Sequence, residues 1–347
     1  MEGLRMATVH DVAALAGVSI ATVSRALREP HRVSDATRER VMSAVRATEY
    51  SPNRSAIGLR TGRTGSIALV VPDVTNPYFS ALTRGAQAAA RESGFGLFVV
   101  DTQESTQLER AEITSIRSHV DGVLLASARL SDDELEDLVD SPTPIVLLNR
   151  LPRPHWPVAG SVVIDESAGA RLAMDHLHAL GHRAIAYVGG PANAWSEVQR
   201  RRAMERAASA YPDLSLVTMR VESPDASGGR ALGPAALADG PTAVVAFNDL
   251  VALGLMSDWA ERGVSVPGDV SLLGHDNTFT TGLSNPHLSS IGVDPMIFGA
   301  HAIDALAEAV VRKRRMRTPG SVVSLPPTLH SRESTAQAAR GGGDGGI

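Results

Sequence analysis

The sequence predicts an α/β protein in which a small helical domain precedes a body of two doubly wound, mostly parallel sheets. Two short stretches of helical periodicity flank Gly17 near the start of the chain. From Ser66 onward, about eleven short β-rich runs alternate with Ala-rich helical stretches, a pattern typical of βαβ units. One open sheet rarely holds that many strands, so we expect two.

The charge of the chain is unevenly distributed. Residues 1–64 hold ten arginines and six acidic residues, a net charge of +4, although the whole 347-residue chain carries −5. A basic N-terminal segment on an otherwise acidic chain indicates that this segment binds a polyanion. The alternative is an uneven distribution of surface charge that has no such partner. The length itself predicts more than one folding unit.

Several classes of protein are disfavoured by what the sequence lacks. It has no cysteine, which removes disulfides, thiolate metal sites and cysteine nucleophiles. Lys313 is the single lysine, which argues against a P-loop or a Schiff-base enzyme. No apolar run approaches the roughly 20 residues that span a bilayer, and the first residues, MEGLRMATVHD, do not resemble a signal peptide. We expect a soluble, cytoplasmic protein without a cofactor, a metal or a membrane partner.

The first two helices are predicted to form one motif. Their apolar residues recur at helical spacing: Val12, Leu15 and Ala16, then Val23, Ala26 and Leu27. Ser19 is of a type that favours helix N-caps. Two short helices across a glycine turn form a helix-turn-helix, which presents its second helix to the major groove of DNA. On residues 19–27 the outward side is predicted to carry Ile20, Ala21, Ser24 and Arg25.

A third helix is predicted to complete the headpiece. It begins after Ser34, its expected N-cap, and its apolar Val41, Met42 and Val45 are expected to cover the first two helices. An ordinary helical corner of a larger domain is the alternative. Of the outward residues, Arg25 can donate a bidentate pair to guanine, whereas Ile20 and Ala21 can only contact thymine methyl groups or exclude other bases.

Specific blocks of sequence resemble one family. The stretches DVAALAGVSIATVSRAL, RVSDATRERV and YSPNRSA closely resemble the head of LacI/GalR-family transcriptional regulators. The blocks LRTGRTGSIALVVPDVTNPYFSAL, GARLAMDHLHALGHRAIAYVGGP, AVVAFNDLVALGLM and VPGDVSLLGHDN resemble later parts of that family, in the same order. The resemblance covers about 320 residues, by the length these blocks span.

This resemblance implies a homodimer that binds a pseudo-palindromic operator, with repression as the expected outcome. By matching positions, it implies DNA contacts from Thr8, Ser19, Ile20, Ala21, Thr22, Ser24, Arg25, Arg32, Ser34, Thr37, Asn53, Ala56 and Leu59. Asn53–Arg60 resembles the hinge helix of the family, in which Leu59 matches a leucine that wedges into the minor groove. Gly58 departs from the usual Ser or Ala, so we expect a hinge that is disordered without DNA.

The implied domains follow from the same blocks. Residues 1–51 are expected to form the DNA-binding headpiece, 52–65 the hinge, 66–334 an effector-binding and dimerisation body of the periplasmic-binding-protein type 1 fold, and 335–347 a disordered tail. Within the body we expect a first subdomain of residues 66–164 plus 291–318. The second subdomain is expected to hold residues 165–290 plus the C-terminal strand. The helical stretches 80–92 and 250–261 are candidates for the dimer face.

Ligands of open α/β sheets lie at the carboxyl ends of the strands, and polar and aromatic residues follow several predicted strands. The expected effector site comprises Asn76, Tyr78, Phe79, Asn149, Trp195, Arg200, Asn248 and Asp276. Neutral amides and a carboxylate beside aromatic faces favour a hydroxyl-rich ligand, so a small-molecule carbohydrate is the leading hypothesis and a nucleoside the alternative. For Asn248 and for Asp249, helix capping is an alternative role.

The site also departs from the family pattern. Where members often carry an effector-clamping arginine, Val198 stands in SEVQRRRAM, and Arg200 lies two places on. Asn149 replaces a common Asp, and Asn277 replaces the second Asp of a frequent pair. Both changes favour a site that avoids a strongly anionic ligand.

Two rival classes find little support in the sequence. An enzyme is disfavoured because GxSxG, HExxH and Walker motifs are missing. A transport receptor, a ligand-binding protein without a DNA function, is disfavoured by the basic N-terminal segment. His176, His178 and His182 superficially resemble metal ligands, but packing or solvated histidines are the preferred interpretation.

Overall fold

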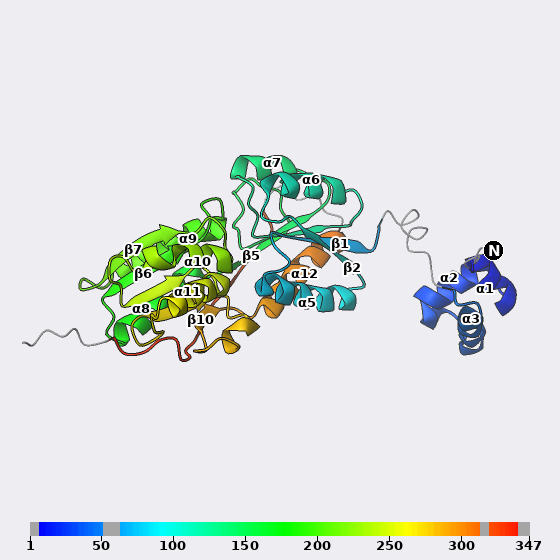
Figure 1. Cartoon of the computed structure of the whole chain (residues 1–347). Helices are drawn as coiled ribbons and strands as arrows, with labels where there is room; N and C mark the ends of the chain where they lie inside the picture. Colours follow the sequence, from blue (N-terminus) through cyan, green and yellow to red (C-terminus); the bar gives the residue numbers. More distant parts are fainter. Residues whose placement is uncertain (1–6, 51–62, 313–318, 339–347) are drawn as a thin grey trace, which may run out of the picture. The chain divides into compact units, whose positions relative to one another are not determined.

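The computed structural model describes residues 7–50, 63–312 and 319–338. Its contacts divide the chain into two units, Met1–Thr64 and Gly65–Ile347, which we call the headpiece and the body (Figure 1). The predicted fold class is confirmed, because a three-helix headpiece precedes a body of two separate six-stranded sheets. No helix in the described ranges is long and apolar enough to cross a membrane.

The headpiece contains α1 (Val9–Ala16), α2 (Ile20–Arg28), the short 3₁₀ helix η1 (Pro30–Arg32) and α3 (Asp35–Ala47). Local side-chain chemistry sets the helix ends. Thr8 and Asp11 form a capping box at the start of α1, Ser19 caps α2 and Ser34 caps α3. Gly17 ends α1 at φ +63°, the left-handed conformation that glycine adopts without steric cost.

The three helices share one small core. Val12, Val23 and Val41 are fully buried, one from each helix. Two expected core residues are not buried, because Leu15 is 59% exposed and Met42 is 37% exposed. Both have the right helical spacing, but a three-helix core this small covers only a narrow stripe of each helix.

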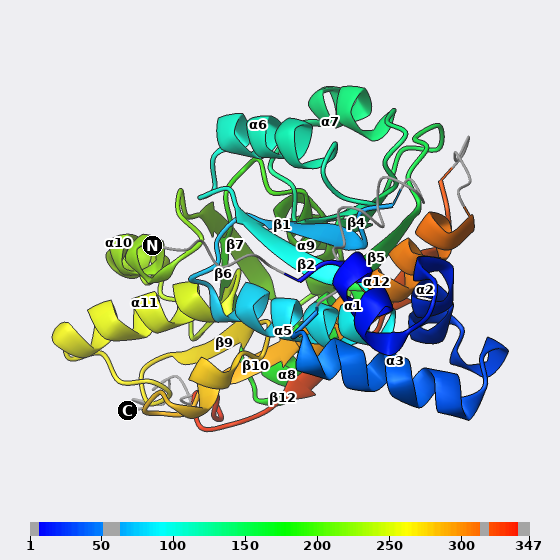
Figure 2. The same cartoon turned by 90° about the vertical axis from the view of Figure 1, so that its right-hand side faces the viewer.

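The first sheet of the body is parallel throughout. Its spatial order is β11 (Val322–Leu325), β5 (Gly160–Ile164), β4 (Ile145–Leu148), β3 (Val123–Ala126), β1 (Ser66–Val71) and β2 (Gly96–Asp101). Two helices cover each face: α5 (Pro77–Glu92) and α12 (Pro295–Arg312) on one, α6 (Thr106–Ile116) and α7 (Asp132–Val139) on the other. The two pairs lie on opposite sides of β1 and β2 in Figure 2.

The second sheet repeats this plan. Its order is β12 (Thr328–His330), β10 (Ser289–Gly292), β9 (Ser271–His275), β8 (Ala243–Ala246), β6 (Ala184–Gly189) and β7 (Ser215–Arg220). Only the β12–β10 pair is antiparallel among the strands of the described ranges. One face packs on α8 (Glu166–Ala179) and α9 (Trp195–Ala208), the other on α10 (Ala226–Ala236) and α11 (Asp249–Glu261). A second 3₁₀ turn, η2 (Phe279–Gly282), follows β9.

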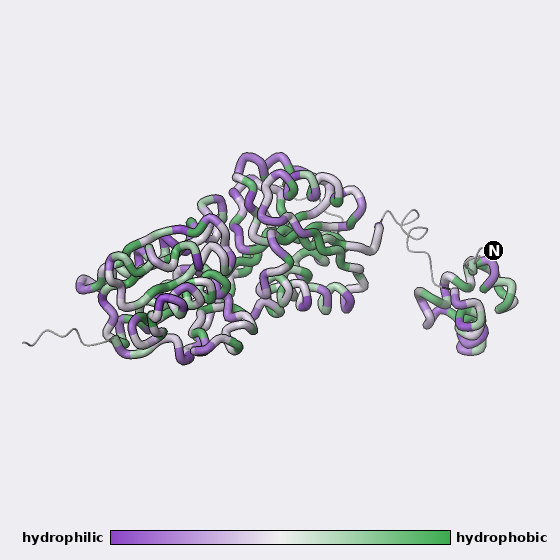
Figure 3. The backbone as a smooth tube through the Cα atoms, in the orientation of Figure 1, coloured by the Kyte–Doolittle hydropathy of each residue, from purple (hydrophilic) through white to green (hydrophobic). Residues whose placement is uncertain are grey.

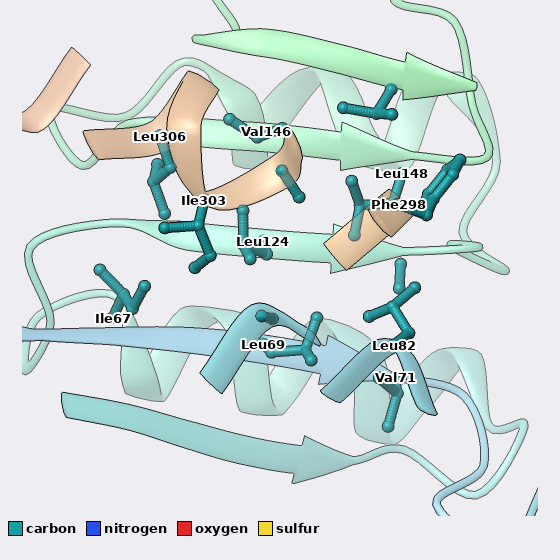
Figure 4. Close-up of a cluster of buried hydrophobic side chains, with 14 of the residues drawn as sticks. Ile67, Leu69, Val71, Leu82, Leu124, Val146, Leu148, Phe298, Ile303 and Leu306 are labelled. Carbon is teal, nitrogen blue, oxygen red and sulfur yellow. The ribbon is translucent and has the colours of Figure 1, made fainter. Parts of the chain in front are cut away.

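The strands inside the body are buried on both faces, which explains their continuous apolar runs. Figure 4 shows the core between the first sheet and α5 and α12, with Leu69, Leu124 and Phe298 among its side chains. In Figure 3 these strands are mainly hydrophobic, whereas polar residues recur along the outer helices. At the crossing of α5 and α12, an added Cβ on Gly85 would lie 2.1 Å from the Met296 carbonyl oxygen, so only glycine permits this close approach.

Two expectations about the C-terminal part of the body are wrong in detail. The last predicted strand, expected in the second subdomain, is Val322–Leu325, and it pairs with β5 in the first sheet. The short β12, which the sequence did not reveal, takes the edge of the second sheet instead. The tail expected to be disordered from Thr335 is ordered to Ala338, because Ala336 N–H bonds Ser271 Oγ at 3.0 Å and Ala338 N–H bonds the Leu180 carbonyl at 2.8 Å.

Candidate functional site

Helix α2 exposes one face and buries the other. Val23 and Ala26 are 0% and 4% exposed and belong to the headpiece core. Ile20, Ala21 and Arg25 are exposed on the opposite side, as the spacing predicted. Ser24, expected there too, is half-buried. An exposed arginine beside apolar side chains on a short helix is a surface that can enter a major groove.

The hydroxyl groups at the N-termini of the headpiece helices are already engaged within the headpiece. Ser19 Oγ accepts the Thr22 N–H at 3.1 Å and lies 2.9 Å from Thr22 Oγ1. Ser34 Oγ donates to Thr37 Oγ1 at 2.9 Å. These bonds fix the start of α2 and α3, where helix-terminal N–H groups favour an anion.

Arg32 lies in the turn between α2 and α3. Its exposed guanidinium pairs with Glu29 at 2.9 Å, an exposed pair that a phosphate can replace at little energetic cost. The predicted hinge residues Asn53, Ala56, Gly58 and Leu59 lie outside the described residues.

The body holds a cleft that encloses about 450 Å³ of space, part of it open to solvent. Residues that follow the carboxyl ends of strands of both sheets line it: Asn76, Tyr78, Phe79, Glu104, Ser127, Arg129, Asn149, Ile164, Ser196, Arg200, Pro224, Phe247, Asn248 and Asp276. This is the position at which open α/β sheets bind ligands.

Seven of the eight expected effector residues line this cleft. Trp195 does not; its neighbour Ser196 does. Besides Ser196, six further lining residues were not predicted: Glu104, Ser127, Arg129, Ile164, Pro224 and Phe247. The same strand-end rule could have found Glu104 after β2, Arg129 after β3 and Pro224 after β7.

One wall of the cleft is a network of neutral groups. Asn149, at the left-handed φ of +55°, donates from Nδ2 to the Tyr78 hydroxyl at 3.0 Å and to Ser127 Oγ at 3.1 Å. Burial raises the pKa of the Tyr78 phenol, which keeps it neutral. Phe79 packs edge-on against the Tyr78 ring with centroids 5.1 Å apart. These residues offer amide and hydroxyl groups beside an aromatic face.

Each subdomain contributes one buried arginine, and each arginine is paired with a carboxylate. Arg129 donates from Nε and Nη2 to Glu104, at 2.5 and 2.9 Å. Arg200 donates from the same two nitrogens to Glu166, at 2.8 and 2.9 Å. Such two-point pairs fix the plane of the guanidinium as well as its position.

Further contacts hold both arginines in place. Glu109 accepts the backbone N–H groups of Arg129 and Leu130 at 2.9 and 3.1 Å, and burial raises the pKa of Glu109 to about 7. The guanidinium of Arg200 lies 5.0 Å from the ring centre of Phe247 and donates to the Phe247 carbonyl.

Asp276 is a half-buried acidic residue that lines the cleft, and its carboxyl accepts no hydrogen bond from the part of the chain that the structure describes. Its backbone has φ +100°, a conformation that L-residues rarely adopt. Burial raises its pKa well above the usual value, and the nearby Asp249 raises it further. A half-buried carboxyl with spare hydrogen-bonding capacity favours a ligand that supplies hydrogen-bond donors.

Asn248 and Asp249 act as structural supports. Asn248 caps α11 by accepting the Val251 N–H at 2.8 Å, and its amide donates to the Pro224 carbonyl at 2.7 Å. Asp249 is buried and accepts from the backbone N–H of Thr278 at 2.7 Å and from Ser290 Oγ at 2.6 Å. Asp249 thereby fixes the loop that carries Asp276.

The three histidines that resembled metal ligands each have another partner. His178 pairs with Asp213 at 3.1 Å, His176 bonds Thr335 at 3.0 Å, and His182 bonds the Ala336 carbonyl at 3.0 Å. Across the described ranges, no group of three or more His, Cys, Asp or Glu residues is arranged to hold a metal ion.

Comparison with known proteins agrees with this geometry in both units. Residues 8–53 match the family of bacterial regulatory proteins of the lacI type, and residues 174–335 match a periplasmic binding protein-like domain. The HTH-type transcriptional regulator DegA of Bacillus subtilis is 33% identical over 339 residues, which cover 95% of this chain and 98% of DegA.

Two solved structures resemble the whole chain. The Lac repressor dimer bound to operator and the anti-inducer ONPF has a TM-score of 0.82 at 26% identity, covering 96% of this chain and 100% of the repressor. The transcriptional regulator CelR in complex with cellobiose has a TM-score of 0.69 at 28% identity, covering 94% and 99%. The chain therefore belongs to the LacI family: it is a transcriptional regulator with a helix-turn-helix headpiece and an effector-binding body, and not an enzyme.

Proposed function

We propose that this chain is a repressor that binds a pseudo-palindromic operator as a homodimer, with an affinity controlled by a small carbohydrate. The observation that carries the proposal is the outward face of α2, where Ile20, Ala21 and Arg25 are exposed on a headpiece of net basic charge. The similar Lac repressor structure, a dimer on its operator, supports the same arrangement for this chain.

The headpiece residues take two roles in this proposal. Arg25 reads a guanine, while Ile20, Ala21 and Ser24 contact neighbouring base edges. Phosphates are bound by the remaining headpiece residues, which fix the register without reading the sequence: Thr8, Ser19, Thr22, Arg32, Ser34 and Thr37. Asn53, Ala56 and Leu59 of the hinge are assigned to the minor groove by resemblance alone.

A second copy of the chain is needed because one headpiece reads only half of a pseudo-palindromic site. One face of each candidate helix for the dimer face is occupied, since α5 packs on α12 and α11 packs on α10, and the exposed face of α5 carries polar side chains such as Arg84 and Arg91. Exposed apolar side chains outside those helices are better candidates: Phe98 on β2 at 52% exposure, Phe279 at 70% and Leu283 at 75% in and after η2. Burying such side chains is the usual driving force for a homodimer.

The effector in this proposal is a carbohydrate bound in the cleft. The amide of Asn149, the hydroxyl of Ser127 and the carboxyl of Asp276 pair with hydroxyl groups, and Tyr78 and Phe79 supply an aromatic wall. The solved complex of the similar regulator CelR with cellobiose supports a sugar as the ligand of this chain. A ligand contact by Trp195 is not proposed, because Trp195 does not line the cleft.

The test of the ligand class is a thermal-shift screen of the full chain against neutral sugars and nucleosides. A ligand that binds only the folded state stabilises it and so raises the melting temperature. At a concentration 100 times its Kd, the added stability is about 2.7 kcal/mol. We expect at least one mono- or disaccharide to raise it. Stabilisation by nucleosides alone contradicts the carbohydrate assignment.

A further inference from the structure

The two arginines of the cleft have the same pattern of contacts although they lie in different subdomains. A guanidinium has five N–H donors. Arg129 uses Nε and Nη2 on Glu104 and Nη1 on the Ser127 carbonyl at 2.7 Å. Arg200 uses Nε and Nη2 on Glu166 and Nη1 on the Phe247 carbonyl. The charge of each arginine is therefore already neutralised inside the protein.

These pairs are shielded from solvent. The side chains of Arg129 and Arg200 are 4% and 5% exposed, and those of Glu104 and Glu166 are 30% and 11% exposed. Water screens a pair weakly in such an environment, so each carboxylate holds its arginine strongly. An anionic ligand has to displace a carboxylate that is already in the preferred two-point geometry.

Apart from Glu104 and the two arginines, the described lining of the cleft has one side chain that can carry a charge near neutral pH, the carboxyl of Asp276. Asp249 lies near enough to raise the pKa of Asp276. With the two arginines neutralised, a phosphate or carboxylate finds no unpaired positive charge among the described residues that line the cleft, so it loses its hydration there without a compensating ion pair. Hydroxyl groups meet no such penalty, because they can donate to carboxylates and accept from the unused guanidinium N–H groups.

We infer that Glu104 and Glu166 determine the specificity of the cleft: they restrict it to uncharged ligands and exclude the phosphorylated and acidic forms of the same sugars. This inference rests on the proposed function for the identity of the cleft as the effector site. The two carboxylates act by occupying the arginines, so their role does not require contact with the ligand. Replacing either carboxylate by an amide is expected to convert the cleft into one that accepts an anion.

The experiment compares ligand pairs on the full-length chain by isothermal titration calorimetry. The probes are glucose with glucose 6-phosphate and ribose with ribose 5-phosphate. For the wild type we expect each phosphate to bind at least about tenfold more weakly than its parent sugar, or not at all. For Glu104→Gln, which frees Arg129, we expect affinity for at least one phosphate to rise about tenfold or more, the gain of a charge-assisted hydrogen bond.

Two further variants keep the comparison decisive. Glu166→Gln frees Arg200 from the other subdomain and is expected to give the same gain, so the test does not depend on one variant folding. Asp137→Asn is the control, because it removes an α7 carboxylate from an exposed pair with Arg110 of α6 and makes the same change in net charge. It is expected to leave phosphate binding at the wild-type level, which corrects for phosphate bound by the basic headpiece.

The outcomes separate this inference from the proposed function. The inference is overturned if the wild-type chain binds a sugar phosphate more tightly than the parent sugar. It is also overturned if Glu104→Gln and Glu166→Gln both bind the phosphates no more tightly than the wild type does. A wild-type chain that binds none of the four probes excludes glucose and ribose as effectors, and the thermal-shift screen decides the carbohydrate assignment. In that case the role of Glu104 and Glu166 is decided by whether Glu104→Gln and Glu166→Gln bind the sugar phosphates more tightly than the wild type does.

Discussion

Arg25→Ala is expected to weaken operator binding strongly and to relax its sequence specificity while leaving the headpiece folded. Arg25 is exposed on α2 and makes no contribution to the core formed by Val12, Val23 and Val41. Loss of one base contact costs about 1–3 kcal/mol, and a homodimer loses it in both half-sites. The combined loss is therefore on the order of 2–6 kcal/mol, if the two sites contribute additively.

The measurement is operator affinity by fluorescence anisotropy, on a duplex selected from a random pool with the wild-type chain. The variant is expected to lose preference at one base pair in each half-site and to retain its weak, salt-dependent binding to unrelated DNA. Arg38→Ala is the control, since it removes the same charge from the exposed side of α3. If Arg25→Ala lowered the affinity for all DNA sequences equally, Arg25 would be a phosphate contact and not a base contact.

Arg200→Leu is expected to lower the free energy of unfolding of the body by about 3–5 kcal/mol, the cost of leaving one partner of a buried pair uncompensated. The residue left behind is Glu166, whose side chain is 11% exposed. The double variant Arg200→Leu, Glu166→Gln carries no unpaired charge, so it is expected to recover most of the loss.

Denaturant unfolding followed by circular dichroism measures both variants. Because the headpiece is a separate unit in the chain, the loss is expected in the body alone, with specific binding of the headpiece to operator intact. Equal destabilisation in the single and the double variant would mean that Arg200 acts through packing on Phe247 and not through its charge.

Patterns within the sequence predicted the architecture well, because the fold depends on local signals. The apolar, β-branched runs of β1, β6 and β8 lie in buried strands and are plain in the sequence. β12 is three residues long and half-exposed, so its own residues do not predict a strand. It forms by pairing with β10, and the paired residues Gly292 and Thr328 are 36 positions apart in the sequence. The ordered residues 335–338 were missed for the same reason, since their hydrogen bonds go to distant positions such as Ser271 and Leu180.

The candidate site was predictable in outline and not in its electrostatics. The rule that ligands lie at strand ends found Asn76, Asn149 and Asp276. It placed Trp195 in the cleft wrongly, because a position at the start of a helix does not fix the direction of the side chain. The pairs Glu104–Arg129 and Arg200–Glu166 join residues 25 and 34 positions apart, so only the folded chain reveals that both arginines are neutralised.

Regulation requires that a ligand bound in the cleft changes the affinity of the headpiece for DNA. Operator affinity of the full chain, measured with and without a saturating sugar from the thermal-shift screen, decides whether this coupling exists. Coupling free energies of about 1–3 kcal/mol are typical, and they predict a change of roughly 5- to 150-fold, with the operator changing the affinity for the sugar by the same factor. A sugar that saturates the cleft but leaves operator affinity unchanged would show that the two sites are independent and would refute control of this regulator by that ligand.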